Sequence, residues 1–185
     1  MILIGLIGCK NSGKDTVADF LVEKHDFKKK SFADTLKKMC KLLFRLEDCQ
    51  LHDALLKEEM DPRWDMTPRK MMQLVGTDMV RNVLDQNFWL KHMDLYLHEE
   101  LPERLVVPDV RFQNEADWIR KHNGVLIRIT DNRKSFNDNH ASETEQFTID
   151  DDLFIFNKKD GIENFYNELQ PIIEPILTIQ KSVCR

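Results

Sequence analysis

The chain has 185 residues, of which 42% are hydrophobic and 32% are charged, and its net charge is −5 at pH 7. This length predicts one domain, residues 1–185, and the negative charge argues against a general nucleic-acid binder, because such proteins are usually basic. No run of about 18 apolar residues occurs, so we expect neither a membrane span nor a membrane partner. The four cysteines have no zinc-type spacing, which is typical of a reduced, cytoplasmic protein.

The first predicted element is an apolar strand over residues 2–7, and a helical pattern follows over residues 14–25. The glycine-rich residues 8–16 lie between them, which is the arrangement of a phosphate-binding P-loop. Glycines let backbone N–H groups turn toward phosphate oxygens, the helix N-terminus adds partial positive charge, and a lysine reaches the phosphates. We expect ATP to bind at Gly8, Lys10, Asn11, Ser12, Gly13, Lys14, Asp15 and Thr16.

One position departs from the general P-loop pattern. Asp15 follows the lysine directly, where Ser or Thr would bind Mg²⁺, and the hydroxyl comes one residue later at Thr16. Adenylate-kinase-like enzymes share that placement, so the departure narrows the class. A glycine-rich turn that merely resembles a P-loop is the alternative, and the flanking strand and helix argue against it.

The middle of the chain carries mostly helical patterns. A short strand is expected over residues 28–32. Thr67-Pro68 marks a helix start, and we expect that helix to be interrupted at Gly76. The other helices are predicted over residues 33–46, 51–60, 78–84 and 88–101.

The last part of the chain alternates strands with helices. Strands are predicted over residues 105–107, 125–129 and 153–156, and helices over 112–122 and 162–179, the latter kinked or broken at Pro171 and Pro175. The polar residues 130–151 are the candidate mobile lid. This order predicts an α/β fold with a parallel sheet, in which ligands bind at the carboxyl ends of the strands.

A second candidate site follows the predicted strand over residues 105–107. There, Asp109 could orient Mg²⁺ and its waters, and Arg111 could grip a phosphate. The alternative is a helix-capping acid beside a surface arginine.

Several further stretches, taken in order, resemble the deoxynucleoside monophosphate kinases of large DNA bacteriophages. They are Gly13 to Ala18, Ser31 to Lys37, Thr67 to Lys70, Gln73, Gly76 to Asp78, Arg81, Phe88-Trp89, Pro108 to Ala116 and His140 to Glu143. The resemblance implies a P-loop NTPase three-layer fold with a helical substrate-binding insertion at about residues 33–100 and a lid at about 130–151. It implies transfer of phosphate from ATP to a deoxynucleoside monophosphate, with the base undetermined, in the cytoplasm, which is the host's if a phage encodes the chain.

By the same resemblance, Lys14 and Thr16 would handle the ATP phosphates and Mg²⁺. The monophosphate and its base would lie among Asp34, Lys37, Arg69, Gln73, Arg81 and Trp89, and the acceptor side would be completed by Asp109, Arg111, Asn114 and Glu115. The transfer places negative charge on equatorial oxygens, so cations supply much of the catalysis. We expect Lys14, Asp109 and Arg111 to be catalytic together with Arg133 from the lid, and Asp109 to share Mg²⁺ with Thr16, directly or through water.

Other interpretations stay open for several of these residues. Arg69 and Arg81 could be exposed helix residues, and Trp89 could be core packing instead of a base-stacking surface. His140 and Glu143 could order the lid or bind a metal, although other ligands at useful spacing are lacking. A homodimer is a further possibility.

Three rival functions remain. Asn157-Lys158-Lys159-Asp160 matches the guanine-reading motif of GTPases, although no switch motif accompanies it. A P-loop kinase for another phosphorylated metabolite, such as dephospho-coenzyme A or phosphomevalonate, would use the same cations. A non-enzymatic ATP-binding module would leave Asp109 and the lid arginines without a role.

Overall fold

The structure is a computed structural model that describes residues 1–132 and 140–183, with side chains up to residue 178. Its described residues fall into two compact units. Unit 1 comprises the described residues within 1–30, 101–139 and 143–185. Unit 2 comprises residues 31–100 and 140–142. Unit 2 thus covers nearly the range in which the family resemblance places a helical insertion. No helix in the described part of the chain is both long and apolar enough to cross a membrane.

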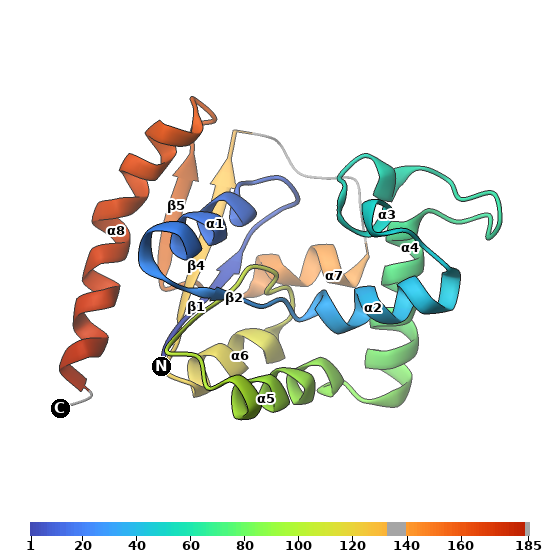
Figure 1. The fold of residues 1–185 in the computed structure, drawn as a ribbon, viewed down its shortest axis with the longest axis horizontal. Helices are drawn as coiled ribbons and strands as arrows, with labels where there is room; N and C mark the ends of the chain where they lie inside the picture. Colours follow the sequence, from blue (N-terminus) through green and yellow to red (C-terminus); the bar gives the residue numbers. More distant parts are fainter. Residues whose placement is uncertain (133–139, 184–185) are drawn as a thin grey trace. The chain divides into compact units, whose positions relative to one another are not determined.

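Unit 1 is built on a five-stranded sheet in the order β2-β3-β1-β4-β5, and every neighbouring pair is parallel (Figure 1). The strands are β1 (Ile2–Ile7), β2 (Lys28–Lys29), β3 (Arg104–Val107), β4 (Val125–Asp131) and β5 (Leu153–Asn157). All six residues of β1 are buried, as expected for a central parallel strand whose two faces are both covered. The predicted α/β class is confirmed.

Helices cover both faces of this sheet. Ile4 and Leu6 share a core with residues of α1 (Lys14–His25) and α8 (Ile162–Val183). On the other face α6 (Gln113–Lys121) approaches so closely that a Cβ on Gly5 would lie 3.1 Å from Ile119. The carboxyl ends of β1, β3, β4 and β5 meet at one edge, which is where ligands bind in such sheets.

Unit 2 is helical in its described residues. Its elements are α2 (Ala33–Phe44), α3 (Asp48–His52), η1 (Leu56–Glu58), α4 (Pro68–Gln73), η2 (Leu74–Leu84) and α5 (Phe88–Glu100). Two short helices precede β5 in the chain: α7 (Ala141–Thr144) and η3 (Glu145–Thr148). Thr67 caps α4 by accepting the N–H of Lys70 at 3.2 Å, so the predicted helix start is confirmed.

Two predicted elements are shorter than expected. The strand expected over residues 28–32 is reduced to Lys28–Lys29. The helix expected over residues 51–60 is wrong in its extent, because Asp53 accepts the N–H groups of Leu55 and Leu56 with its carboxylate. Those bonds replace helical ones, so only α3 and the short η1 form.

Two predicted helix breaks are also wrong, while a kink at the prolines of the last helix stays a prediction. The helix is not interrupted at Gly76, because a π-helical stretch, η2, carries the chain through it. A Cβ at this glycine would lie 2.5 Å from Leu36, so glycine permits a close packing contact there. The other helix, α8, is unbroken at Pro171 and Pro175. Both prolines are exposed, and carbonyls that lose a partner on that side can bond to water.

Candidate functional site

The loop between β1 and α1 has the backbone shape that phosphate binding requires. Gly8 and Gly13 have φ angles of 153° and 116°, and Asn11 has a φ of 60°. A Cβ at Gly8 would lie 2.3 Å from the carbonyl oxygen of Ile129, so no other residue fits there. The Ser12 Oγ is buried and has no hydrogen-bond partner among the described residues. An unsatisfied buried hydroxyl in this loop suits a ligand that brings hydrogen-bonding atoms.

Lys14 begins α1 and turns back onto this loop. Its Nζ donates to the carbonyl oxygens of Gly8 and of Cys9, the latter at 2.7 Å. Burial, and next the positive charge of Arg111, lower the pKa of Lys14 to about 8. Burial therefore disfavours the charged ammonium, and a bound anion would relieve that cost.

Arg111 lies beyond the end of β3 and forms an ion pair with Glu143. Neither side chain is fully exposed, since 30% of Arg111 and 10% of Glu143 is accessible. Burial opposes the charge of Arg111, but Glu143 and Asp109 more than compensate, so its pKa is raised. Unit 1 thus brings Lys14, Asp109, Arg111 and Glu143 into one electrostatic group at the sheet edge.

Glu115 accepts backbone hydrogen bonds that the sequence analysis did not predict. Its carboxylate accepts the backbone N–H groups of Arg111 at 2.8 Å and Phe112 at 3.2 Å, and so caps the start of α6. Its side chain is buried. This contact fixes the backbone that carries Arg111, while Asn114 is partly exposed beside it. A role for either residue in binding substrate stays a prediction.

Asp15 and Thr16 differ in their surroundings. The Asp15 side chain is 84% exposed and lies 3.2 Å from Lys29 Nζ on β2. Thr16 is partly buried in the first turn of α1. The threonine is therefore the better placed of the two to supply an oxygen beside the loop.

The other predicted substrate residues all lie in unit 2. Asp34, in the first turn of α2, accepts the N–H of Ser31 at 3.1 Å, and Arg69 pairs with Glu58 at 2.5 Å. Arg81 is 6% exposed and donates to the carbonyl of Gln86 at 3.1 Å. Lys37 and Gln73 are partly exposed. Their substrate roles stay predictions.

Trp89 is packed inside unit 2. Its side chain is 4% exposed, and the indole N–H donates to the carbonyl of Gly76 at 2.9 Å. This environment favours the core-packing interpretation, and stacking on a base stays a prediction.

His140 and Glu143 have different partners among the contacts that the structure describes. His140 lies 2.8 Å from Ser142 Oγ and 3.7 Å from Asp78, whereas Glu143 pairs with Arg111. The described residues include no group of three or more potential metal ligands. The predicted lid arginine, Arg133, lies outside the described residues.

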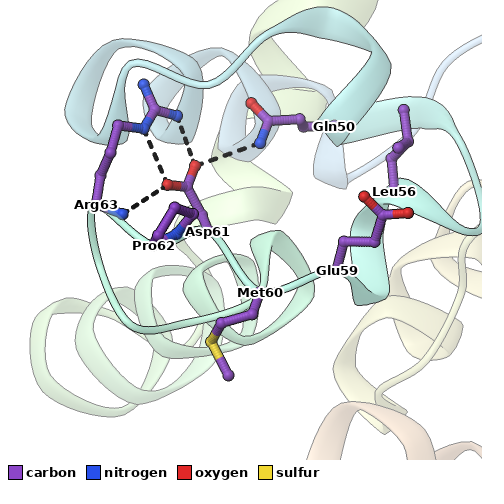
Figure 2. A pocket seen from close by; sticks show the side chains of 7 residues that line it. All are labelled: Gln50, Leu56, Glu59, Met60, Asp61, Pro62 and Arg63. Carbon is purple, nitrogen blue, oxygen red and sulfur yellow. Dashed lines mark hydrogen bonds and ion pairs between the residues drawn. The ribbon is translucent and has the colours of Figure 1, made fainter.

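A cavity of about 310 Å³ in unit 2 is lined by none of the predicted site residues (Figure 2). Its lining consists of Gln50, Leu56, Glu59, Met60, Asp61, Pro62 and Arg63. Asp61 is held by Arg63, with Nε 2.9 Å away, and by Gln50 at 3.3 Å. Because these polar groups satisfy one another, the cavity is better explained as a gap beside a braced loop than as a reaction site.

Three residues near the P-loop were not among the predicted site residues: Glu143, Asn157 and Lys159. Glu143 was noted for ordering the lid, and its contact with Arg111 joins residues 32 positions apart. Asn157 and Lys159 hydrogen-bond to the loop carbonyls of Ser12 and Asn11. Their position directly after a strand was the signal that could have found them.

Known proteins with related sequences carry a consistent name. The sequence profile of the family described as "Deoxynucleotide monophosphate kinase" matches residues 48–169. A protein of Acanthamoeba polyphaga mimivirus assigned to the same activity is 43% identical over 183 residues, covering 91% of this chain and 94% of that protein. The deoxynucleoside-5'-monophosphate kinase of Escherichia phage T5 is 31% identical over 127 residues, covering 58% of this chain and 49% of the phage protein. This chain matches about half the length of that phage relative.

Among solved structures, a sugar kinase from Janibacter sp. is similar with a TM-score of 0.50 and 10% identity, covering 94% of this chain and 95% of that one. A likeness at this identity concerns the fold alone. The family match over more than half of the chain, together with the viral relative matched over nearly its whole length, is decisive. The chain belongs to the deoxynucleotide monophosphate kinase family.

Proposed function

We propose that this protein transfers the γ-phosphoryl group of ATP to a deoxynucleoside 5'-monophosphate, giving ADP and the deoxynucleoside diphosphate. The observation that carries the proposal is a P-loop in which Lys14 lies against the loop carbonyls, with Arg111 close enough that its charge adds to burial in lowering the pKa of Lys14. The like charge of Arg111 disfavours the charged form of Lys14, so an anion bound beside both cations would stabilise that form. Family membership supports phosphate as the group transferred.

The reaction needs positioning and charge more than acid–base chemistry. An acceptor phosphate is already an anion, so no general base has to activate it, and its oxygen can attack the γ-phosphorus in line. Lys14 and Arg111 would stabilise charge on the equatorial oxygens, and Arg133 would add a third cation from the lid. Unit 2 would hold the monophosphate and base through Asp34, Lys37, Arg69, Gln73, Arg81 and Trp89.

Thr16 and Asp109 are the residues that would hold Mg²⁺, directly or through water. A hydroxyl and a carboxylate are the hard oxygen donors that this ion prefers, so the donor set fits. When bound, Mg²⁺ neutralises charge on the transferring phosphates. Asp109 also lies close enough to Arg111 to raise its pKa, and so supports the arginine in its charged form.

Two rival functions can be compared with this proposal. The same cations would serve a kinase for another phosphorylated metabolite, and the family match argues for a nucleotide. A guanine-reading role for Asn157 is weakened because its amide oxygen accepts the Lys159 N–H and its amide nitrogen donates to Ser12. We place the reaction in the cytoplasm, or in the host's cytoplasm if the chain is virally encoded.

An ATP-coupled assay tests the proposal. The purified chain is given ATP and Mg²⁺ with each deoxy- and ribonucleoside monophosphate, and with dephospho-coenzyme A and phosphomevalonate as control acceptors. We expect ADP formation only with nucleotides, at a rate reduced at least 100-fold in Arg111→Met. Arg120→Met on the neighbouring helix is the matched control and should retain activity. Turnover with a control acceptor and none with nucleotides would overturn the proposal.

A further inference from the structure

The carboxyl end of β5 and the turn after it are joined to the P-loop by two side chains. Asn157 Nδ2 donates to the carbonyl oxygen of Ser12 at 2.9 Å, and Lys159 Nζ donates to the carbonyl oxygen of Asn11 at 2.7 Å. The two segments are 145 or more residues apart in the sequence. Both acceptors belong to the part of the P-loop that precedes Gly13.

Asn157 is buried, and both polar atoms of its side-chain amide form hydrogen bonds. Its side chain is 5% exposed, and its Oδ1 accepts the backbone N–H of Lys159 at 3.0 Å. A Cβ added to Gly13 would lie 2.4 Å from Asn157 Nδ2, so the glycine leaves the space that the amide occupies. The strand register places Asn157 beside Asp131 of β4, whose carboxylate lies 3.7 Å from Lys159 Nζ.

These bonds constrain the direction of the loop's peptide groups. In a trans peptide the C=O and the following N–H point in opposite directions. Holding the Ser12 carbonyl on Asn157 therefore directs the N–H of Gly13 to the opposite side. Holding the Asn11 carbonyl on Lys159 likewise fixes a residue with a φ of 60°, in the left-handed region that residues other than glycine adopt infrequently. The loop is kept in its phosphate-binding shape from outside.

The four residues from Asn157 to Asp160 thus have a different role from the guanine-reading motif that their sequence matches. In Asn157-Lys158-Lys159-Asp160, the motif lysine Lys158 pairs with Glu168 of α8, away from the loop. The residue at the variable position, Lys159, makes the loop contact instead. The asparagine contacts a loop carbonyl and its own turn.

We infer that Asn157 is a positioning residue for the donor triphosphate, acting through the Ser12–Gly13 peptide of the P-loop, with Lys159 as its weaker second support. This inference rests on the part of the proposed function that gives the P-loop to ATP, and it does not depend on which acceptor is used. Loss of the brace should lower affinity for ATP more than it lowers affinity for the monophosphate.

Calorimetric titration with ATP, without any acceptor, tests the inference directly. Asn157→Leu keeps a similar size and removes the donor, and it should weaken ATP binding about tenfold, the effect of leaving one buried carbonyl without its partner. Lys159→Met should weaken ATP binding about threefold, because its side chain is half exposed. Lys159→Arg keeps a hydrogen-bond donor at this position and should bind ATP about as tightly as the unmodified protein does. Lys158→Met, one residue away and without a loop contact, is the matched control and should bind as the unmodified protein does.

Steady-state kinetics separate positioning from general loss of structure. KM for ATP should rise in Asn157→Leu while KM for the acceptor stays within about twofold. Unchanged ATP affinity in both Asn157→Leu and Lys159→Met would overturn the inference, as would an equal loss for ATP and acceptor. If Asn157→Leu does not fold, the exposed Lys159→Met decides the matter. Normal ATP binding with no transfer to any nucleotide would overturn the proposed acceptor and leave this inference standing.

Discussion

Lys14 provides a prediction that can be worked out from the structure, because burial and the charge of Arg111 lower its pKa to about 8. An ordinary lysine stays mostly charged up to about pH 10. In the nucleotide-free protein, about half of the Lys14 side chains are neutral at pH 8 and roughly nine-tenths at pH 9. Only the ammonium can neutralise phosphate oxygens, so kcat/KM for ATP should fall about tenfold between pH 7 and pH 9.

Initial rates at low ATP and saturating acceptor, measured from pH 7 to 9.5, give this profile. The profile of kcat/KM reports the free enzyme, so it should show the lowered pKa, whereas kcat should fall only at higher pH because bound phosphates stabilise the charge. Two substitutions give opposite shifts. Arg111→Met should raise the pKa of Lys14 by removing a like charge, and Glu143→Gln should lower it by removing an opposite one.

An NMR titration of the Lys14 side chain in nucleotide-free protein measures the same pKa without catalysis. Lys121→Met, an exposed change in unit 1, is the control and should leave the titration unaltered. A kcat/KM profile that stays flat to pH 9.5, or shifts of the same sign in Arg111→Met and Glu143→Gln, would refute the electrostatic reasoning.

Three further substitutions probe individual contacts. Glu143→Gln should destabilise the protein by about 2 kcal/mol, lowering Tm by roughly 4–8 °C, since the partly buried Arg111 loses its charged partner; an unchanged melting curve would contradict the pairing. Trp89→Phe should cost about 1–2 kcal/mol in urea unfolding, because the carbonyl of Gly76 loses its donor. If KM for the acceptor rises strongly as well, Trp89 contacts the base. Asp61→Asn should destabilise the protein at pH 7, and the difference should shrink as the pH falls below about 4. The arginine beside Asp61 holds the pKa of that carboxylate well below its usual range, so its contribution is present above the unfolded value and lost on acidification; a difference that does not change between pH 7 and 3 would exclude this origin.

The elements that could be predicted from the sequence have local causes. The apolar run of β1 predicts a buried strand, and the glycines before Lys14 predict a phosphate-binding loop. Neither signal depends on a distant part of the sequence. Thr67-Pro68 is equally local, and α4 begins there. The same local signals correctly predicted β3, β4 and β5 to within two residues.

The failures share a cause that lies outside local sequence. Gly76 resembles a helix stop, but its lack of a side chain lets Leu36 pack closely against it. Its carbonyl oxygen also accepts a hydrogen bond from the Trp89 indole N–H. Pro171 and Pro175 are tolerated because they lie on the exposed side of α8. In the site, the Arg111–Glu143 ion pair joins residues that are 32 positions apart in the sequence. Helix and strand periodicity does not extend over that separation, so it could not predict the pair.

Both principal cations have partners within the protein itself. Lys14 bonds to its own loop carbonyls, and Arg111 pairs with Glu143. An incoming anion must therefore replace two separate sets of partners, and it gains both cations only if its charged groups extend from one to the other. A single phosphate can replace one set and leaves the other cation with its protein partner. A triphosphate carries several anionic groups along its length and can replace both. We therefore expect the arrangement to favour the triphosphate donor by requiring two exchanges at once, while Asn157 holds the loop on which the first exchange takes place.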